Sequence, residues 1–303
     1  MISAKIDGAD LKSMGLLLLE GSLDGFFKYP KRKTVTYNDW AESDGIEADL
    51  TEFKAESRSF TISLAYRGSD FMGVYSSLLQ KLSAPRYRTI EICGVSRSVR
   101  LDVSSSLKLP YSIKGGVGTC SFTFVEDNPQ PEEAEPYCGK FIPSVFCVAG
   151  YDMMEFGIGS EDPGDDLLKA PRLKDPFTNG NEYDLSEVKS RHKETRLNLW
   201  MVADSPDEFV NNWRAFYSKW AVPGLVDLYV TRAGRSVQAY YTDCPSFQIV
   251  AFGDRGVGAN LSISIVIPQC DWLSMGGTSV ERGLYAPELD SLLTDEEGNV
   301  LII

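Results

Sequence analysis

Histidine is almost absent from this chain, because the 303 residues contain only His192. Without a second histidine, neither an HExxH motif nor a histidine metal cluster can form, and a Ser-His-Asp triad would have to use this residue. His192 lies in the charged run 189–194, which is typical of a solvated surface. We predict no catalytic, cofactor-binding or metal-binding residues and expect that the protein is not an enzyme. Two carboxylates alone can serve a glycosidase, but no pattern selects such a pair among the 43 acidic residues.

Cysteine and glycine also lack the spacings of known sites. None of the cysteines forms a CxxC pair, so we expect reduced, mostly buried thiols rather than a zinc site or a disulfide framework. The glycine-rich segments 115–118 and 253–258 lack the Lys-Ser/Thr of a P-loop and indicate hairpin turns. The six cysteines are Cys93, Cys120, Cys138, Cys147, Cys244 and Cys270.

Long apolar runs are missing as well. The longest near the N-terminus, residues 14–19, is far too short to cross a membrane, and no basic segment precedes it. We therefore expect no signal peptide, no membrane partner, and synthesis in a cytoplasm.

Positive charge is scarce in the second part of the chain. Residues 1–126 hold 16 Lys and Arg against 15 Asp and Glu, whereas residues 127–303 hold 14 against 28, and the net charge is −13. Nonspecific binding to a nucleic-acid backbone requires a positively charged surface, so this acidic charge balance disfavours it. The acidic balance is compatible with a surface that DNA passes without sticking.

The sequence does contain an internal repeat. Residues 6–126 and 148–267 carry the same signals in the same order, at an offset that drifts only between about 135 and 142 residues. This period is too long for a solenoid unit and indicates two whole domains of one fold, each with its own core. The matched segments are 6–10 with 148–152, 26–30 with 167–171, 49–54 with 184–189, Pro85 with Pro223, 97–99 with 235–237, and 116–118 with 256–258.

Each copy is predicted to be β-rich with one helix. Apolar stripes with helical spacing occupy 70–83 and 205–220, where Ser205 is a candidate N-cap, Pro206 suits the first helical position and Glu208 completes a capping box. Alternating or short apolar runs predict strands at 57–66, 89–93, 98–103 and 120–125, and at 195–201, 227–230, 236–241 and 261–266.

The fold class that follows is α+β and mainly antiparallel β, as two tandem copies of a small β-barrel or sandwich, each with one helix. Three prolines and four acids at 127–136 mark a linker. We place the first barrel domain at 1–126, an acidic, proline-rich linker and lead-in at 127–147, the second copy at 148–270, and a polar, acidic C-terminal tail at 271–303.

Several short segments of the first copy follow one another in an order typical of one family. They are Ile6-Asp7-Gly8 with Gly15, Pro30-Lys31-Arg32-Lys33, the stretch from Asp39-Trp40 to Asp44-Gly45, the strand around 60–64 and the helix 70–83. In this order they resemble the ring-forming domain of distal tail proteins of long-tailed bacteriophages and prophages. The second copy has no Trp equivalent to Trp40 and a shorter segment there, which leaves open whether both copies make the same contacts.

The resemblance implies a structural protein of the virion tail, made in the cytoplasm of the bacterial host. Such a protein forms a ring at the distal end of the tail tube and joins the tube to the host-binding tip. The implied partners are further copies of the chain, as a pseudo-sixfold trimer or a hexamer, together with tail-tube and tail-tip or hub proteins. DNA would be passing cargo in the central channel.

A second interpretation is a two-domain binding module for a cell-surface glycan or protein. Such a module is expected to be monomeric and to expose an aromatic groove, whereas a ring protein associates with itself.

Overall fold

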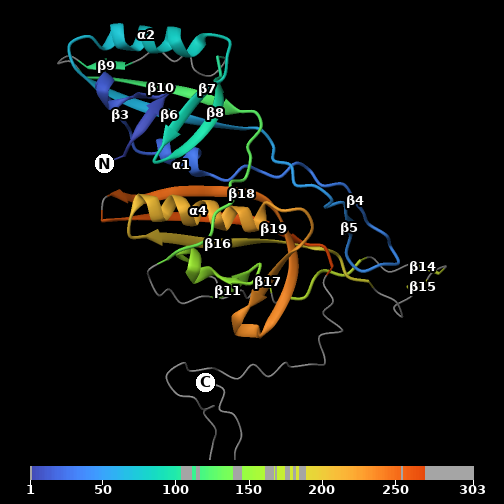
Figure 1. Cartoon of the computed structure of the whole chain (residues 1–303). Coiled ribbons are helices and arrows are strands. Elements are labelled where there is room, and N and C mark those ends of the chain that lie inside the picture. The colour runs from blue at the N-terminus through green and yellow to red at the C-terminus, as the bar shows by residue number, and fades with distance from the viewer. Residues whose placement is uncertain are drawn as a thin grey trace, which may run out of the picture.

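Two curled antiparallel sheets, one from each half of the chain, form the computed structural model of this protein (Figure 1). We call residues 2–126 the first half and residues 145–267 the second half. The C-terminal tail and Cys270 lie outside the described residues. The structure describes residues 2–103, 111–113, 117–138, 145–160, 167, 169–174, 178–179, 182–183, 189–253 and 255–269.

The first half builds an eight-stranded sheet in which β9 pairs with β10 beside the main path β2-β1-β7-β8-β10-β6-β3. Its longest strand pair is β6 with β10, whose register runs from Arg58 opposite Glu126 to Arg67 opposite Val117. The strands are β1 (Ala4–Ile6), β2 (Ala9–Asp10), β3 (Leu16–Leu18), β6 (Arg58–Arg67), β7 (Arg88–Ile92), β8 (Val95–Leu101), β9 (Tyr111–Ile113) and β10 (Val117–Glu126).

The second half builds a seven-stranded sheet in the order β12-β11-β17-β18-β19-β16-β13. Its first strand begins before residue 148, so part of the expected linker and lead-in, 127–147, belongs to this sheet. The strands are β11 (Phe146–Val148), β12 (Tyr151–Asp152), β13 (Ile158–Ser160), β16 (Lys193–Ala203), β17 (Val226–Val230), β18 (Arg235–Gly253) and β19 (Gly256–Ile267).

The two sheets have the same strand order when strands are numbered within each half. In both, the first strand pairs with the second and with the strand that follows the helix, and the last strand pairs with the strand that precedes the helix. The mainly antiparallel fold with two half-barrel sheets is therefore confirmed.

The helices begin and end close to their predicted positions. α2 (Phe71–Ser83) starts after Asp70, whose side chain accepts from the N–H of Gly73, and α4 (Pro206–Trp220) starts after Ser205, which accepts from the N–H of Glu208. The Glu208 carboxylate accepts from the N–H of Asp204 and not from that of Ser205, so the predicted capping box is only half formed.

The prediction of one helix per copy is incomplete. The first half has an additional short helix, α1 (Ser22–Phe27), whose Leu23, Phe26 and Phe27 are buried. Three 3-10 turns are described, η1 (Lys12–Met14), η2 (Met153–Phe156) and η3 (Thr231–Ala233), together with a two-stranded hairpin of β14 (Thr178–Asn179) and β15 (Glu182–Tyr183) in the second half of the chain. None of the described helices combines the length and apolarity that a membrane span needs.

One of the sequence matches is shifted in the structure. The hairpin β7–β8 turns through two residues between Ile92 and Val95, whereas β17–β18 turns through four between Val230 and Arg235. Counted by strand register, Arg97 is therefore equivalent to Val237 and not to Arg235. The sequence alone hides this shift, because Arg-Ser-Val occurs after the turn in both copies. The turn of the second copy is two residues longer, so the two triplets occupy different register positions.

The hydrophobic cores of the two halves are continuous. A single hydrophobic cluster runs through both halves, because α1 of the first half lies against α4 and β18 of the second. Residues 127–138, which include the expected linker 127–136, run along α4, where the Tyr137 N–H donates to Asn212 at 2.7 Å and Asn211 donates to the Glu135 carbonyl.

Candidate functional site: the contact between the two halves

An aromatic cluster joins α1 to α4. The Phe27 ring meets the rings of Phe209 and Trp213 edge-on, at 5.4 Å between centroids in each case. The Trp213 Nε1–H donates to the Phe27 carbonyl at 2.7 Å. Edge-on aromatic pairs and a satisfied indole N–H are favourable in a buried contact, so this cluster holds the two halves together.

Tyr29, just after α1, extends the cluster. Its ring stacks on Tyr217 at 4.7 Å and on Trp213 at 5.4 Å, and its hydroxyl donates to the Trp213 carbonyl at 2.9 Å. Burial raises the pKa of Tyr29 well above its ordinary value, so the hydroxyl keeps the proton that it donates.

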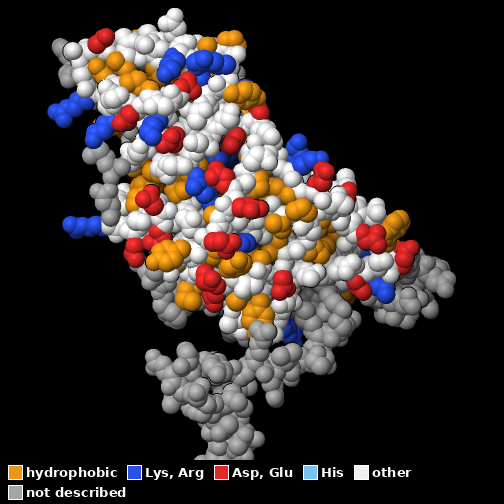
Figure 2. All heavy atoms as spheres, in the orientation of Figure 1, with side chains coloured by type: hydrophobic (Ala, Val, Ile, Leu, Met, Phe, Trp, Pro, Cys, Tyr) orange, Lys and Arg blue, Asp and Glu red, His pale blue; other side chains and the backbone are white. Residues whose placement is uncertain are grey.

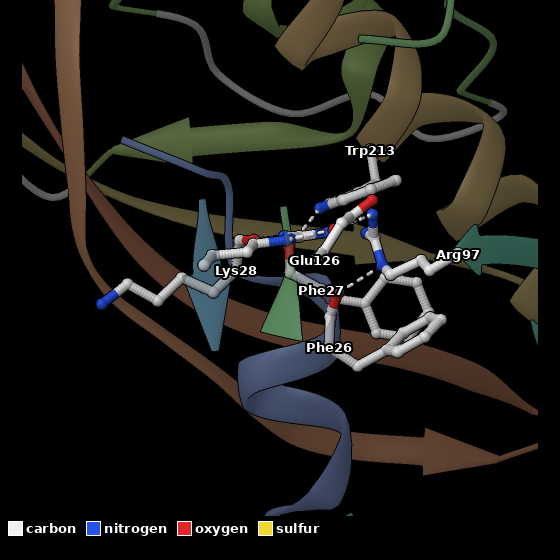
Figure 3. A network of polar contacts seen from close by, with 7 residues as sticks. Phe26, Phe27, Lys28, Arg97, Glu126 and Trp213 are labelled. Atoms are coloured by element: carbon white, nitrogen blue, oxygen red, sulfur yellow. Dashed lines mark hydrogen bonds and ion pairs between the residues drawn. The ribbon is translucent and has the colours of Figure 1, made fainter. Parts of the chain in front are cut away.

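A buried polar network fixes the C-terminal end of α1 (Figure 3). Arg97 donates to the Phe26 carbonyl at 3.1 Å and to Glu126 at 3.3 Å, while Arg58 donates to Glu126 at 2.7 Å and to the Lys28 carbonyl. Two cations thus face the carbonyls at the negative end of α1, the favourable sign for a helix C-terminus. Burial lowers the pKa of Arg97 to about 9, and Glu126 supplies the opposing charge.

An arm of the first half, residues 28–57, continues from α1 along the second half (Figure 1). It carries the small hairpin β4 (Tyr37–Asn38) and β5 (Glu47–Ala48). The Arg32 N–H donates to the Thr242 carbonyl at 2.9 Å, and Ile46 packs with Leu50 of the arm against Tyr240 and Val266. The arm is therefore an ordered contact rather than a loose loop.

The tip of the arm is fixed by polar contacts to residues 174 and 190. Asp44 accepts from the backbone N–H of Ser190 at 2.6 Å and from its hydroxyl at 2.9 Å, and the Gly45 N–H donates to the Ser190 carbonyl at 2.8 Å. Lys174 pairs with Asp39 at 2.6 Å. The Ser190 backbone N–H first, and its hydroxyl with it, lower the pKa of Asp44, and Lys174 lowers that of Asp39.

A polar cleft of about 420 Å³ lies beside this tip. Trp40 is half-exposed at its edge, and the Trp40 Nε1–H donates to Glu47 at 3.0 Å. Both the arm and the second half line the cleft, through residues that include Asn38, Glu42, Asp44, Lys189 and Gln269.

His192 is not the solvated residue that the charged run predicts. It is half-buried, with its ring 5.9 Å from that of Tyr37 on the arm and its Nε2 at 3.6 Å from Glu194. The arm from the other half covers it, which a charge pattern within the second copy cannot reveal. Among the described residues, no group of three or more His, Cys, Asp or Glu side chains is placed to hold a metal ion.

The described thiols for which a pKa shift is resolved are weakly acidic. Burial raises the pKa of Cys93 and Cys120 to about 11 and that of Cys244 to about 12. These three cysteines are protonated thiols at neutral pH. Of the five described cysteines, Cys120 and Cys244 are buried, whereas Cys93, Cys138 and Cys147 are only partly buried.

The Arg58–Arg97–Glu126 network was missed in the sequence analysis, although the sequence carries a signal for it. Arg97 and Glu126 occupy the buried phase of the alternation in β8 and β10, where the neighbouring inward positions are apolar. A charged residue in an apolar phase is a candidate for a buried pair. The pairing itself depends on strands that are distant in the sequence.

Comparison with known proteins gives weak likenesses, all of them to solved structures. No family model matches the chain, and no curated protein matches it. Among solved structures, the Dit protein (gp 19.1) of phage SPP1, described as a paradigm of the hub adsorption apparatus in phages that infect Gram-positive bacteria, aligns over 88% of this chain and 98% of its own. The identity is 9% and the TM-score 0.29, values too low to support a conclusion about this chain.

Proposed function

We propose that this chain is a structural protein of a phage or prophage tail, which forms a ring at the distal end of the tail tube and joins the tube to the host-binding tip. The resemblance of the first copy to ring-forming distal tail domains is the starting point. The ring, the tube and the tip proteins as partners, and the location in the virion tail all belong to this proposal.

The observation that carries the proposal is how the two halves meet. They share one strand order, which supports an internal duplication, and they join through different faces: α1 and the arm of the first half against α4 and β18 of the second. A contact between unlike faces of like units is heterologous, and heterologous contacts close into rings when the rotation allows it. Three chains would supply six such units, and six chains could instead stack two rings.

The mass of the particle in solution tests this proposal. We expect light scattering at high protein concentration to give a trimer or a hexamer, and electron microscopy to show rings of threefold or sixfold symmetry with an open channel. A chain that stays strictly monomeric and instead binds a surface polysaccharide would contradict the ring.

A glycan-binding module is the second candidate, and the cleft beside Trp40 is the observation that favours it. A half-exposed indole next to carboxylate and amide groups offers one apolar face and several polar partners. Binding of host cell-wall polysaccharide that Trp40→Ala abolishes, and that the exposed change Tyr87→Ala leaves intact, would support this candidate.

A further inference from the structure

The helices α2 and α4 occupy the same place in their sheets but differ in how they are covered. Counted back from Pro85 and Pro223, the buried α2 residues Phe71, Leu78 and Leu82 correspond to the buried α4 residues Phe209, Phe216 and Trp220. The helix faces that pack on their own sheets are therefore equivalent.

The flanks beside these buried faces are not equally covered. Trp213 and Tyr217 of α4 are each 4% exposed, because Phe27 and Tyr29 of the first half lie on them. The equivalent α2 residues, Tyr75 and Leu79, are only half-buried.

One α2 position shows the difference most clearly. Met72 is 54% exposed, whereas its α4 equivalent Val210 is 4% exposed. Hydrophobic side chains also lie on the surface near α2 in the space-filling view (Figure 2). Among the described residues, α2 has no counterpart of the contact that Phe27 and Tyr29 make with α4.

The second half presents the matching piece. Its segment 169–174 is hydrogen-bonded to 189–191 in the same way as residues 28–33, the base of the arm, are hydrogen-bonded to 54–56. The Lys33 N–H donates to the Lys54 carbonyl and the Lys174 N–H donates to the Lys189 carbonyl, both at 2.7 Å. In the arm base, Arg32 is 3% exposed because it lies on the other half, while its equivalent Leu173 is 62% exposed. Likewise Tyr29 is buried and its equivalent Ala170 is exposed.

We infer that the exposed flank of α2 (Met72 with the half-buried Tyr75 and Leu79) is the docking surface for a second copy of this chain, whose residues 169–173 sit where residues 28–32 sit on α4. The partner is a second copy because the two uncovered surfaces belong to opposite ends of one molecule and match the two sides of its internal contact. This inference rests on the proposed ring and specifies the contact that would close it.

Single charges test the surface. Met72→Glu and Leu173→Glu each place a carboxylate at an exposed position of one of the two proposed contact surfaces. The isolated chain tolerates a charge there, whereas an interface that excludes water does not. We expect either change to weaken association roughly 30-fold or more in light scattering. Val250→Glu, at a residue that is 64% exposed and lies outside both surfaces, should leave association unchanged.

Cross-linking provides a second measurement that does not depend on weakening the assembly. The in-chain pair Tyr29–Tyr217 corresponds to Ala170 of one chain and Leu79 of the next. With a short bis-maleimide reagent, Ala170→Cys combined with Leu79→Cys should give dimers and closed trimers on a denaturing gel, above the level of either single variant.

The possible outcomes separate the two proposals. Rings that form in the wild type and persist in both Glu variants, with no extra cross-link in the double-Cys chain, would overturn the docking surface and leave the ring in place. A wild-type chain that forms no rings would count against the proposed function and, with it, against this surface. Loss of rings in both Glu variants together with the specific cross-link supports the inference.

Discussion

At the scale of single residues, buried charge holds the junction in place. Arg97 and Glu126 are 6% and 7% exposed, and Arg97 also lies over the Phe26 ring, 4.7 Å from its centroid. Charges taken out of water are tolerated only when they are paired and hydrogen-bonded. In this network each charge has a partner of opposite sign, although the buried Nη2 of Arg58 and that of Arg97 form no hydrogen bond with the described residues. The network links the ends of β6 and β10 to carbonyls around α1, so it orients the helix that docks on the second half.

Removing the charge of Glu126 should therefore destabilise the protein strongly. Glu126→Gln keeps the size of the side chain but leaves the guanidinium groups of Arg58 and Arg97 without their counter-charge, and we expect a loss of about 3–5 kcal/mol in the free energy of unfolding by urea. Glu91→Gln, which removes a solvent-exposed partner of Lys5, is the matched control and should have little effect. Equal effects of the two changes would show that the buried network has no special role.

At the scale of elements, the arm 28–57 lies against the second half by close backbone approach. Gly45 adopts φ +67°, and a Cβ atom at this position would lie 1.8 Å from the Pro268 carbonyl oxygen. Only glycine combines this left-handed conformation with the room that the neighbouring strand leaves.

Gly45→Ala should detach the tip of the arm. We expect faster cleavage of the 36–48 segment in limited proteolysis, because the added methyl group forces the hairpin away from residues 190 and 268. Gly21→Ala is the control, since Gly21 has φ +82° but no atom within 4 Å of the place that an added methyl group would take, and it should show only the cost of the backbone conformation, about 1–2 kcal/mol. Unchanged proteolysis of the Gly45 variant would mean that the arm is not held at its tip.

At the scale of the whole molecule, the acidic net charge disfavours nonspecific binding to DNA. The net charge of −13 gives the chain no excess of the positive groups that neutralise phosphates. The proposed ring would benefit from this balance, because like charge keeps DNA in the channel from binding to its wall.

We expect no retardation of duplex DNA by the protein in a mobility-shift assay, even at low salt, where electrostatic attraction is least screened. A basic protein of similar mass serves as the positive control. Retardation that disappears as salt is added would reveal a positive surface and contradict the role of DNA as passing cargo.

The sequence by itself predicted the longer strands β6–β8, β10 and β16–β19, the helices α2 and α4 and their order in two halves, since periods of two and 3.6 residues and the cap at Ser205 are local signals. It did not predict the short strands β1–β3 and β11–β13, which have too few residues to show a period. The scarcity of histidine and of basic residues also needs no structure to interpret. Local pattern could not place α1, because six residues are too few to show a helical stripe.

Only the tertiary structure decided what the two halves do to each other. Segments that are distant in the chain decide why Trp213 is buried whereas its equivalent Tyr75 is only half-buried. They also decide the half-burial of His192 and the pairing of Arg97 with Glu126. Equivalent sequence positions thus have different surroundings, because a residue's burial is set by the element that packs on it and not by its neighbours in sequence.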